Sequence, residues 1–122
     1  MHVELLHRNG RDISLISGDE VLITDPQSAL DLAMGVKYET GAARMVLDKA
    51  LFCEDFFVLS TGLAGEVLQK WINYHIKAAL YGDFSRYTSK PLRDFIYESN
   101  QGTNFFFLPS CEEAVERLSR VP

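Results

Sequence analysis

The chain has 122 residues, of which 47% are hydrophobic and 24% charged, and its formal net charge is −5. This length supports one hydrophobic core that buries roughly two thirds of the unfolded surface, so we expect a single domain, residues 1–122, that needs no disulfide or metal to fold. The acidic balance removes the electrostatic attraction on which nucleic-acid binding depends and disfavours acidic lipid surfaces, so we expect neither nucleic acid nor membrane as a partner.

The two cysteines, Cys53 and Cys111, lie far apart and form no C-x-x-C motif, which excludes a zinc ribbon and a thioredoxin-like motif. Charged residues occur too early at the N-terminus for a signal peptide. No uncharged apolar stretch approaches the ~20 residues of a membrane helix. We therefore expect reduced cysteines and a cytoplasmic protein.

Asn9-Gly10 stands between two segments rich in apolar residues, which is the strongest short-range signal for a β-hairpin. We predict its strands over about residues 2–8 and 11–17. Residues 21–24, Val-Leu-Ile-Thr, fit either a short separate strand or the tail of an extended second strand. An exposed edge on the first hairpin strand would also allow a homo-oligomer.

Asp25-Pro26 supplies a helix N-cap and a proline suited to the first helical turn. The helix that follows ends at Gly41, and its apolar face consists of Leu30, Ala33, Met34 and Tyr38. Residues 44–48 predict a strand, and an irregular stretch follows it. Phe56-Phe57 in that stretch either folds over the sheet as a lid or offers a surface to a partner, and we favour the lid.

The second half of the chain repeats the alternation of helix and strand. Ser60-Thr61-Gly62 precedes an amphipathic helix that extends to about residue 75, with Trp71 and Tyr74 on its core face. Residues 76–81 are apolar on both faces and predict an interior strand. A third helix begins near residues 88–91 and ends near residues 100–102.

The last two elements are a strand and a helix. Residues 105–108, Phe-Phe-Phe-Leu, predict a buried central strand. Ser110 and Glu113 have capping-box spacing and begin a final helix. The element order is therefore β-β-α-β-α-β-α-β-α, which predicts an α/β fold with a mostly parallel sheet and an antiparallel N-terminal hairpin.

Several segments of the second half resemble the bacterial domain-of-unknown-function family numbered 4180, and they are specific together. They are Ser60–Lys70, Asn73-Tyr74, Gly82–Ser85 and Ser89–Asn100. The resemblance implies a bacterial cytosolic domain, and that family brings no assigned activity with it.

The element order also looks like the STAS fold of anti-sigma-factor antagonists. In those proteins a serine or threonine at the start of the second helix, after a strand and an aspartate, is phosphorylated by a partner kinase and controls partner binding. The resemblance implies Ser60 or Thr61 as the phosphoacceptor. Asp48 lies at the strand end, about a dozen residues before them, and Asp55 lies within the intervening insertion.

Polar residues follow the predicted parallel strands, where open α/β sheets usually bind ligands. Asp83 and Ser85 leave a buried strand directly into a loop, and Asp48 could share a metal with Asp83 or divide acid and base roles with it. Aspartate after a strand is also ordinary turn chemistry. Arg93 could pair with Asp83 or bind an anion, or it could be a solvated surface residue. The histidines form no spaced ligand set, and we predict no metal and no cofactor.

Two kinds of function fit this pattern, and the sequence leaves open whether the protein is an enzyme. We favour a non-enzymatic regulatory domain that binds a partner protein through Ser60, Thr61, Asp83 and Ser85. The alternative is a small ligand-binding protein or enzyme that holds an anionic ligand in a polar pocket at the carboxyl ends of the strands. A concave pocket with convergent polar groups and perturbed carboxylates would favour the alternative, and a flat surface would favour the first.

Overall fold

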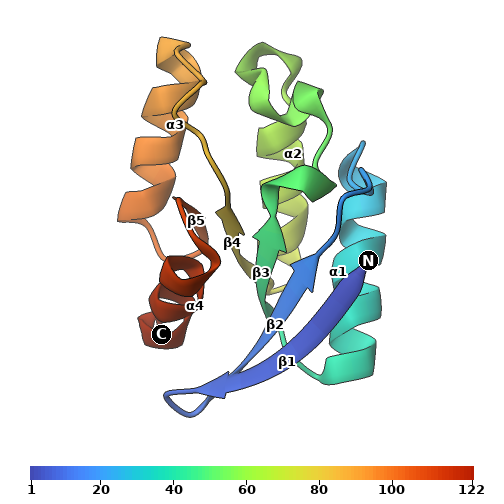
Figure 1. Ribbon diagram of the computed structural model, residues 1–122. Helices are drawn as coiled ribbons and strands as arrows, with labels where there is room; N and C mark the ends of the chain where they lie inside the picture. The colour runs from blue at the N-terminus through green and yellow to red at the C-terminus, as the bar shows by residue number, and fades with distance from the viewer.

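A five-stranded sheet runs through the computed structural model, which describes residues 1–122 (Figure 1). β1 (His2–Arg8) and β2 (Arg11–Ser17) pair antiparallel, and β3 (Arg44–Asp48), β4 (Lys77–Tyr81) and β5 (Phe105–Leu108) continue the sheet in parallel. Each strand pairs with the next one along the chain, so the spatial order is β1-β2-β3-β4-β5. The predicted α/β fold, its element order and its antiparallel hairpin are confirmed.

The hairpin has the turn that Asn9-Gly10 predicts. Both residues have positive φ, 56° and 77°, as a two-residue type I′ turn requires. Residues 21–24 form neither of the two strands considered for them. They contribute a single isolated parallel bridge from Ile23 to Phe52, because the chain is already turning toward the first helix.

Three helices cover one face of the sheet and a fourth covers part of the other (Figure 1). α1 (Pro26–Thr40), α2 (Leu63–Asn73) and α3 (Lys90–Gln101) connect successive parallel strands. Right-handed crossovers that always advance in one direction place such helices on the same face. The larger core of 22 buried residues lies beneath them, and a smaller core of 6 lies beneath α4 (Cys111–Arg120).

The helix ends follow the predicted capping chemistry with one difference. Asp25 and Ser28 form a complete capping box on α1, and Gly41 ends that helix with a φ of 78°. On α4 the Ser110 hydroxyl accepts from the Glu113 amide at 3.2 Å. The Glu113 carboxylate accepts a hydrogen bond from the Ser110 hydroxyl at 3.0 Å and not from the Ser110 amide, so only half of the predicted capping box forms.

Two predicted core residues are in solvent and one predicted central strand is at an edge. Tyr38 is 92% exposed, because it lies outside the buried face of α1. That face consists of Ala29, Leu30, Ala33 and Val36. Tyr74 lies beyond the end of α2 and is 45% exposed, whereas Trp71 is fully buried and donates its indole N–H to the Ala29 carbonyl at 3.0 Å. β5 is an edge strand, and it is buried because α3 packs on one side and α4 on the other.

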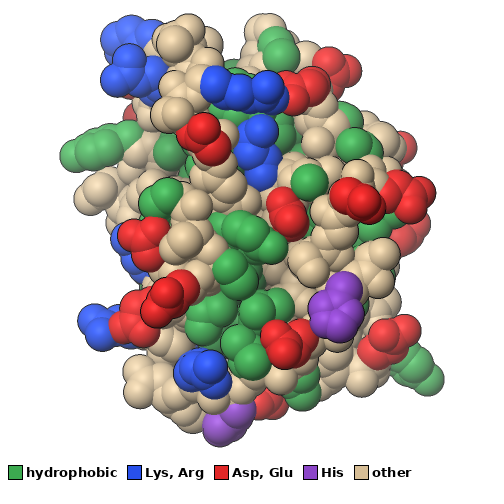
Figure 2. Space-filling model, in the orientation of Figure 1, with side chains coloured by type: hydrophobic (Ala, Val, Ile, Leu, Met, Phe, Trp, Pro, Cys, Tyr) green, Lys and Arg blue, Asp and Glu red, His purple; other side chains and the backbone are tan.

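α4 lies over β2 to β5 and leaves β1 uncovered on this face. Figure 2 shows apolar side chains between acidic ones in the middle of this view. The partly buried apolar residues packed against the smaller core are Leu15, Tyr81, Leu108, Cys111, Val115 and Val121. No helix is both long enough and apolar enough to cross a bilayer.

Candidate functional site

The carboxyl ends of β3 and β4 lead into the two segments that form the candidate site. After β3 the chain makes three short 3-10 turns, η1 (Lys49–Leu51), η2 (Glu54–Phe57) and η3 (Leu59–Thr61). After β4 a loop over residues 82–89 leads to α3. In an open α/β sheet, ligands usually bind beyond the carboxyl ends of the parallel strands. The space between these two segments is therefore the place to look for a binding site.

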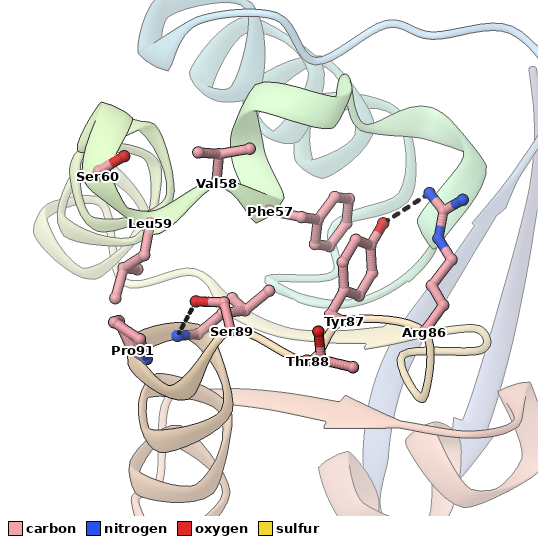
Figure 3. Close-up of a pocket in the computed structure, with 10 residues that line it drawn as sticks. Phe57, Val58, Leu59, Ser60, Arg86, Tyr87, Thr88, Ser89 and Pro91 are labelled. Carbon is pink, nitrogen blue, oxygen red and sulfur yellow. Dashed lines mark hydrogen bonds between the residues drawn. The ribbon is translucent and has the colours of Figure 1, made fainter.

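A groove of about 620 Å³ separates these two segments. Phe57 to Ser60 line one side, and Arg86 to Ser89 with Pro91 and Leu92 line the other, so that five of its ten residues are hydrophobic. Figure 3 shows Val58 and Leu59 across the groove from Ser89 and Pro91, with the rings of Phe57 and Tyr87 forming the wall at the end toward Arg86. The groove therefore combines an apolar lining with hydroxyl groups at its rim.

Phe57 and Tyr87 are stacked, with ring centroids 5.0 Å apart and an angle of 15° between the planes. Lys49 Nζ lies 5.1 Å from the Tyr87 ring centre and 5.4 Å from that of Phe57. The Arg86 guanidinium lies 4.9 Å from the Tyr87 ring centre, on the side of that ring away from Val58 and Leu59 (Figure 3). The aromatic wall thus has two cations against it, in the range of cation–π attraction.

Arg86 is held by two groups from both sides of the site. It pairs with Glu54 of η2 and donates to the Tyr87 hydroxyl at 3.0 Å. These interactions, that with Tyr87 foremost, raise the pKa of Arg86 above its ordinary value. Lys49 is in none of the four ion pairs of the protein, so its ammonium group is open to an anion.

Gly82 allows the loop after β4 to lie against Lys49. Its φ is 154°, a backbone conformation that L side chains rarely adopt. A Cβ at this position would lie 2.7 Å from Lys49 Cβ, much closer than an ordinary contact. The small residue therefore sets the distance between the two segments of the site.

Asp83 and Ser85 interact with each other. Asp83 Oδ1 accepts from the Ser85 amide at 2.9 Å and from the Ser85 hydroxyl at 2.6 Å. These bonds lower the pKa of Asp83, so the carboxyl is ionised at neutral pH. The two residues line a separate hollow of about 420 Å³ with Phe84 and Pro109, and not the groove that Ser60 lines.

Ser60 and Thr61 precede the N-cap of α2, which is Gly62 with a φ of 79°. Neither residue is the N-cap itself, although the Thr61 hydroxyl accepts from the Leu63 amide at 3.2 Å. The same hydroxyl lies 2.8 Å from the Asp55 carbonyl and 2.9 Å from the Val58 carbonyl, and it donates to these oxygens. Thr61 thus joins the turns to α2, and Ser60 is exposed at the groove.

The remaining candidates lie around the same end of the sheet but do not converge. Asp48 Oδ1 accepts from the Ala50 amide at 2.9 Å and caps η1. Burial and then the charge of Asp48 raise the pKa of Tyr81 to about 12. Asp48 therefore acts on the α4 side, whereas Asp83 is influenced by Lys49 and Arg86. No three His, Cys, Asp or Glu side chains are grouped as metal ligands.

Arg93 forms no ion pair with Asp83. It lines a hollow of about 590 Å³ that it shares with Ser85 and Tyr87. Asp55 is exposed, and it is its backbone carbonyl that bonds to Thr61.

The irregular segment behaves as a lid and also offers an apolar side chain. Phe56 and Phe57 are buried in the main core, which confirms that they fold over the sheet. The buried ring of Phe57 also lines the groove. The neighbouring Val58 is 48% exposed instead. Sequence reasoning missed Val58, Arg86 and Tyr87, because none of them carries a motif and their proximity depends on the path of the insertion.

The chain is a small α/β domain with a groove beyond the carboxyl ends of its parallel strands. A family model described as "Domain of unknown function (DUF4180)" matches residues 8–118, and the chain belongs to that family. Neither the curated proteins nor the solved structures include a match to this chain.

Proposed function

We propose that this protein is a non-enzymatic regulatory domain of the bacterial cytoplasm, and that it binds a partner protein through the groove between residues 57–60 and 86–92. The observation that carries the proposal is the exposed apolar side of this groove. Val58 is 48% exposed beside Leu59, and Pro91 is exposed on the other side. An exposed apolar wall rimmed by hydroxyl groups suits an apolar side chain of a partner.

The two carboxylates beyond the carboxyl ends of β3 and β4, Asp48 and Asp83, favour binding over catalysis. A general acid needs a carboxyl whose pKa is raised toward neutrality. The pKa of Asp83 is lowered by its bonds to Ser85, and Asp48 is used to cap η1. The resemblance of the element order to anti-sigma-factor antagonists points in the same direction, toward regulation through a partner.

Phosphorylation of Ser60 would give such a domain its switch. Ser60 is exposed on the groove, whereas the Thr61 hydroxyl is bonded to the backbone of the preceding turns. A phosphate would add a charge of about −1.5 to −2 to an otherwise apolar wall. Ser60 is therefore the better phosphoacceptor of the two, and Ser60→Glu is expected to reduce partner binding.

Two valines provide a matched test, because Val58 and Val21 are equally exposed at 48% and only Val58 lines the groove. Affinity capture from a lysate of the source organism, followed by mass spectrometry, compares the wild-type protein with Val58→Asp and Val21→Asp. We expect Val58→Asp alone to lose the captured partner while both variants keep a wild-type melting temperature within a few degrees. Equal capture by all three proteins would contradict the proposal.

A second function, binding of a small anionic ligand with or without catalysis, is favoured by the shape and charge of the site. The groove is concave, and its volume of about 620 Å³ lies within the ~300–1,000 Å³ of small-molecule pockets. Lys49 does not line the groove, but its ammonium group lies against the Phe57 and Tyr87 rings that do, and it is in no ion pair. Thermal shifts with inorganic phosphate and a nucleotide panel test this function, with Lys49→Met as the variant and Lys37→Met as the control. A dose-dependent shift that only Lys49→Met abolishes would favour the ligand over the partner protein.

A further inference from the structure

The outer edge of β1 is the longest unpaired stretch of backbone in the sheet. β1 has seven residues and pairs only with β2, whereas the other edge strand, β5, has four. No helix packs extensively on β1, although Val3 contacts the larger core. An edge of this kind is a template for another strand.

The hairpin turn determines which residues of β1 face outward. In a type I′ turn the residues that flank it, here Arg8 and Arg11, form a hydrogen-bonded pair. Hydrogen-bonded and non-hydrogen-bonded pairs alternate along antiparallel strands. The amide and carbonyl groups of Val3, Leu5 and His7 therefore point away from β2 toward the free edge.

β1 is complementary to itself when two copies run antiparallel about Leu6. In that register Glu4 lies opposite Arg8 of the second copy, and symmetry repeats the pair. Leu5 lies opposite His7, which aligns the outward-facing backbone groups of the two chains. Opposite charges directly across two strands stabilise their pairing.

The exposure of β1 agrees with this arrangement. Leu5 is 48% exposed, and in this register it lies diagonally beside Leu5 of the second copy, within reach of a side-chain contact. Glu4 is in no ion pair of the single chain. In the single chain Arg8 donates only to the His7 carbonyl, at 3.2 Å. In the dimer the Arg8 guanidinium would pair with Glu4 of the second copy instead, and the His7 carbonyl would accept from the backbone of the second strand.

We propose that two copies of this chain form a symmetric dimer by antiparallel pairing of β1 with β1, centred on Leu6, with two Glu4–Arg8 pairs. The pairing joins the two sheets into one of ten strands and leaves the groove, which lies beyond the ends of β3 and β4, free. A symmetric two-fold contact of this kind closes on itself and does not propagate into fibres.

Charge reversal tests the register, with sedimentation equilibrium of the full chain from about 1 μM to about 1 mM as the measurement. We expect a concentration-dependent dimer. Glu4→Arg and Arg8→Glu each replace two attractive pairs with two repulsive ones, so each variant should weaken dimerisation by about tenfold or more. The double variant, with both changes, should restore the wild-type dissociation constant within about threefold.

Leu5→Pro provides a second test that spares the fold, because the amide it removes points outward and edge strands accept proline. We expect this variant to be monomeric with an unchanged circular dichroism spectrum, and Val58→Asp to dimerise like the wild type. A wild-type protein that is monomeric at every concentration overturns the proposal. A dimer that the single charge reversals leave unchanged, or that only Val58→Asp disrupts, overturns it as well.

Discussion

Replacing Gly82 with alanine should destabilise the protein by about 2–6 kcal/mol. The φ of 154° lies where residues other than glycine are strained, at a cost of about 1–3 kcal/mol. The new Cβ would also lie 2.7 Å from Lys49 Cβ, where ordinary contacts measure 3.4–4 Å. Lys49 Cβ belongs to the stiff base of its side chain, so η1 and the loop must separate, which adds about 1–3 kcal/mol of overpacking.

Urea unfolding and thermal melting measure this effect, and Gly65→Ala is the matched control. Gly65 lies in α2, and a Cβ added there would have no neighbouring atom within 4 Å, so its replacement should stabilise the protein by about 0.5–1 kcal/mol. We expect Gly82→Ala to lower Tm by roughly 6–30 °C, given about 3–5 °C per kcal/mol for a domain of this size. If both variants unfold within ~0.5 kcal/mol of the wild type, the loop does not approach Lys49 closely enough to require glycine.

Three further effects follow from individual contacts. Trp71→Phe removes the indole N–H from the buried Ala29 carbonyl and leaves a small cavity, so urea unfolding should show a loss of about 2–4 kcal/mol; a loss under ~0.5 kcal/mol would exclude that bond. Thr61→Val should cost about 1–2 kcal/mol by losing its bonds to the preceding turns, whereas Ser60→Ala should leave the unfolding midpoint unchanged. Hydrogen bonds from Ser28 lower the pKa of Asp25 below 3.8, so the stabilising effect of this carboxylate is present above pH 3.8 and is lost as the pH falls through the folded pKa. Asp25→Asn should therefore make the loss of stability in acid less steep. An unchanged dependence of stability on acid pH would contradict this.

The two proposals concern different parts of the sheet and can be tested separately. The groove lies beyond the carboxyl ends of β3 and β4, and the proposed dimer uses the outer edge of β1. Val58→Asp changes only the groove, and Glu4→Arg changes only the edge. A dimer could therefore present two grooves to one partner complex, and loss of either property would leave the other measurable.

The sequence by itself determined the elements whose causes are local. The Asn9-Gly10 turn needs two residues that accept positive φ, and Asp25-Pro26 and Gly41 supply the chemistry of a helix start and a helix end. These signals act within a few residues, so they can be found without knowing the fold. The alternation of strands and helices then indicated the parallel sheet, because short right-handed crossovers leave few other arrangements.

Only the tertiary structure decided which side chains meet at the site. Val58 and Tyr87 come from segments separated by a helix and a strand, and their groove depends on how the 3-10 turns after β3 fold back over the core. Asp83 and Ser60 were expected to share one surface, yet they line different hollows, because the chain between β3 and α2 displaces Ser60 toward α3. Side chains that follow different strands are brought together by packing of the whole core, and no local pattern records that distance.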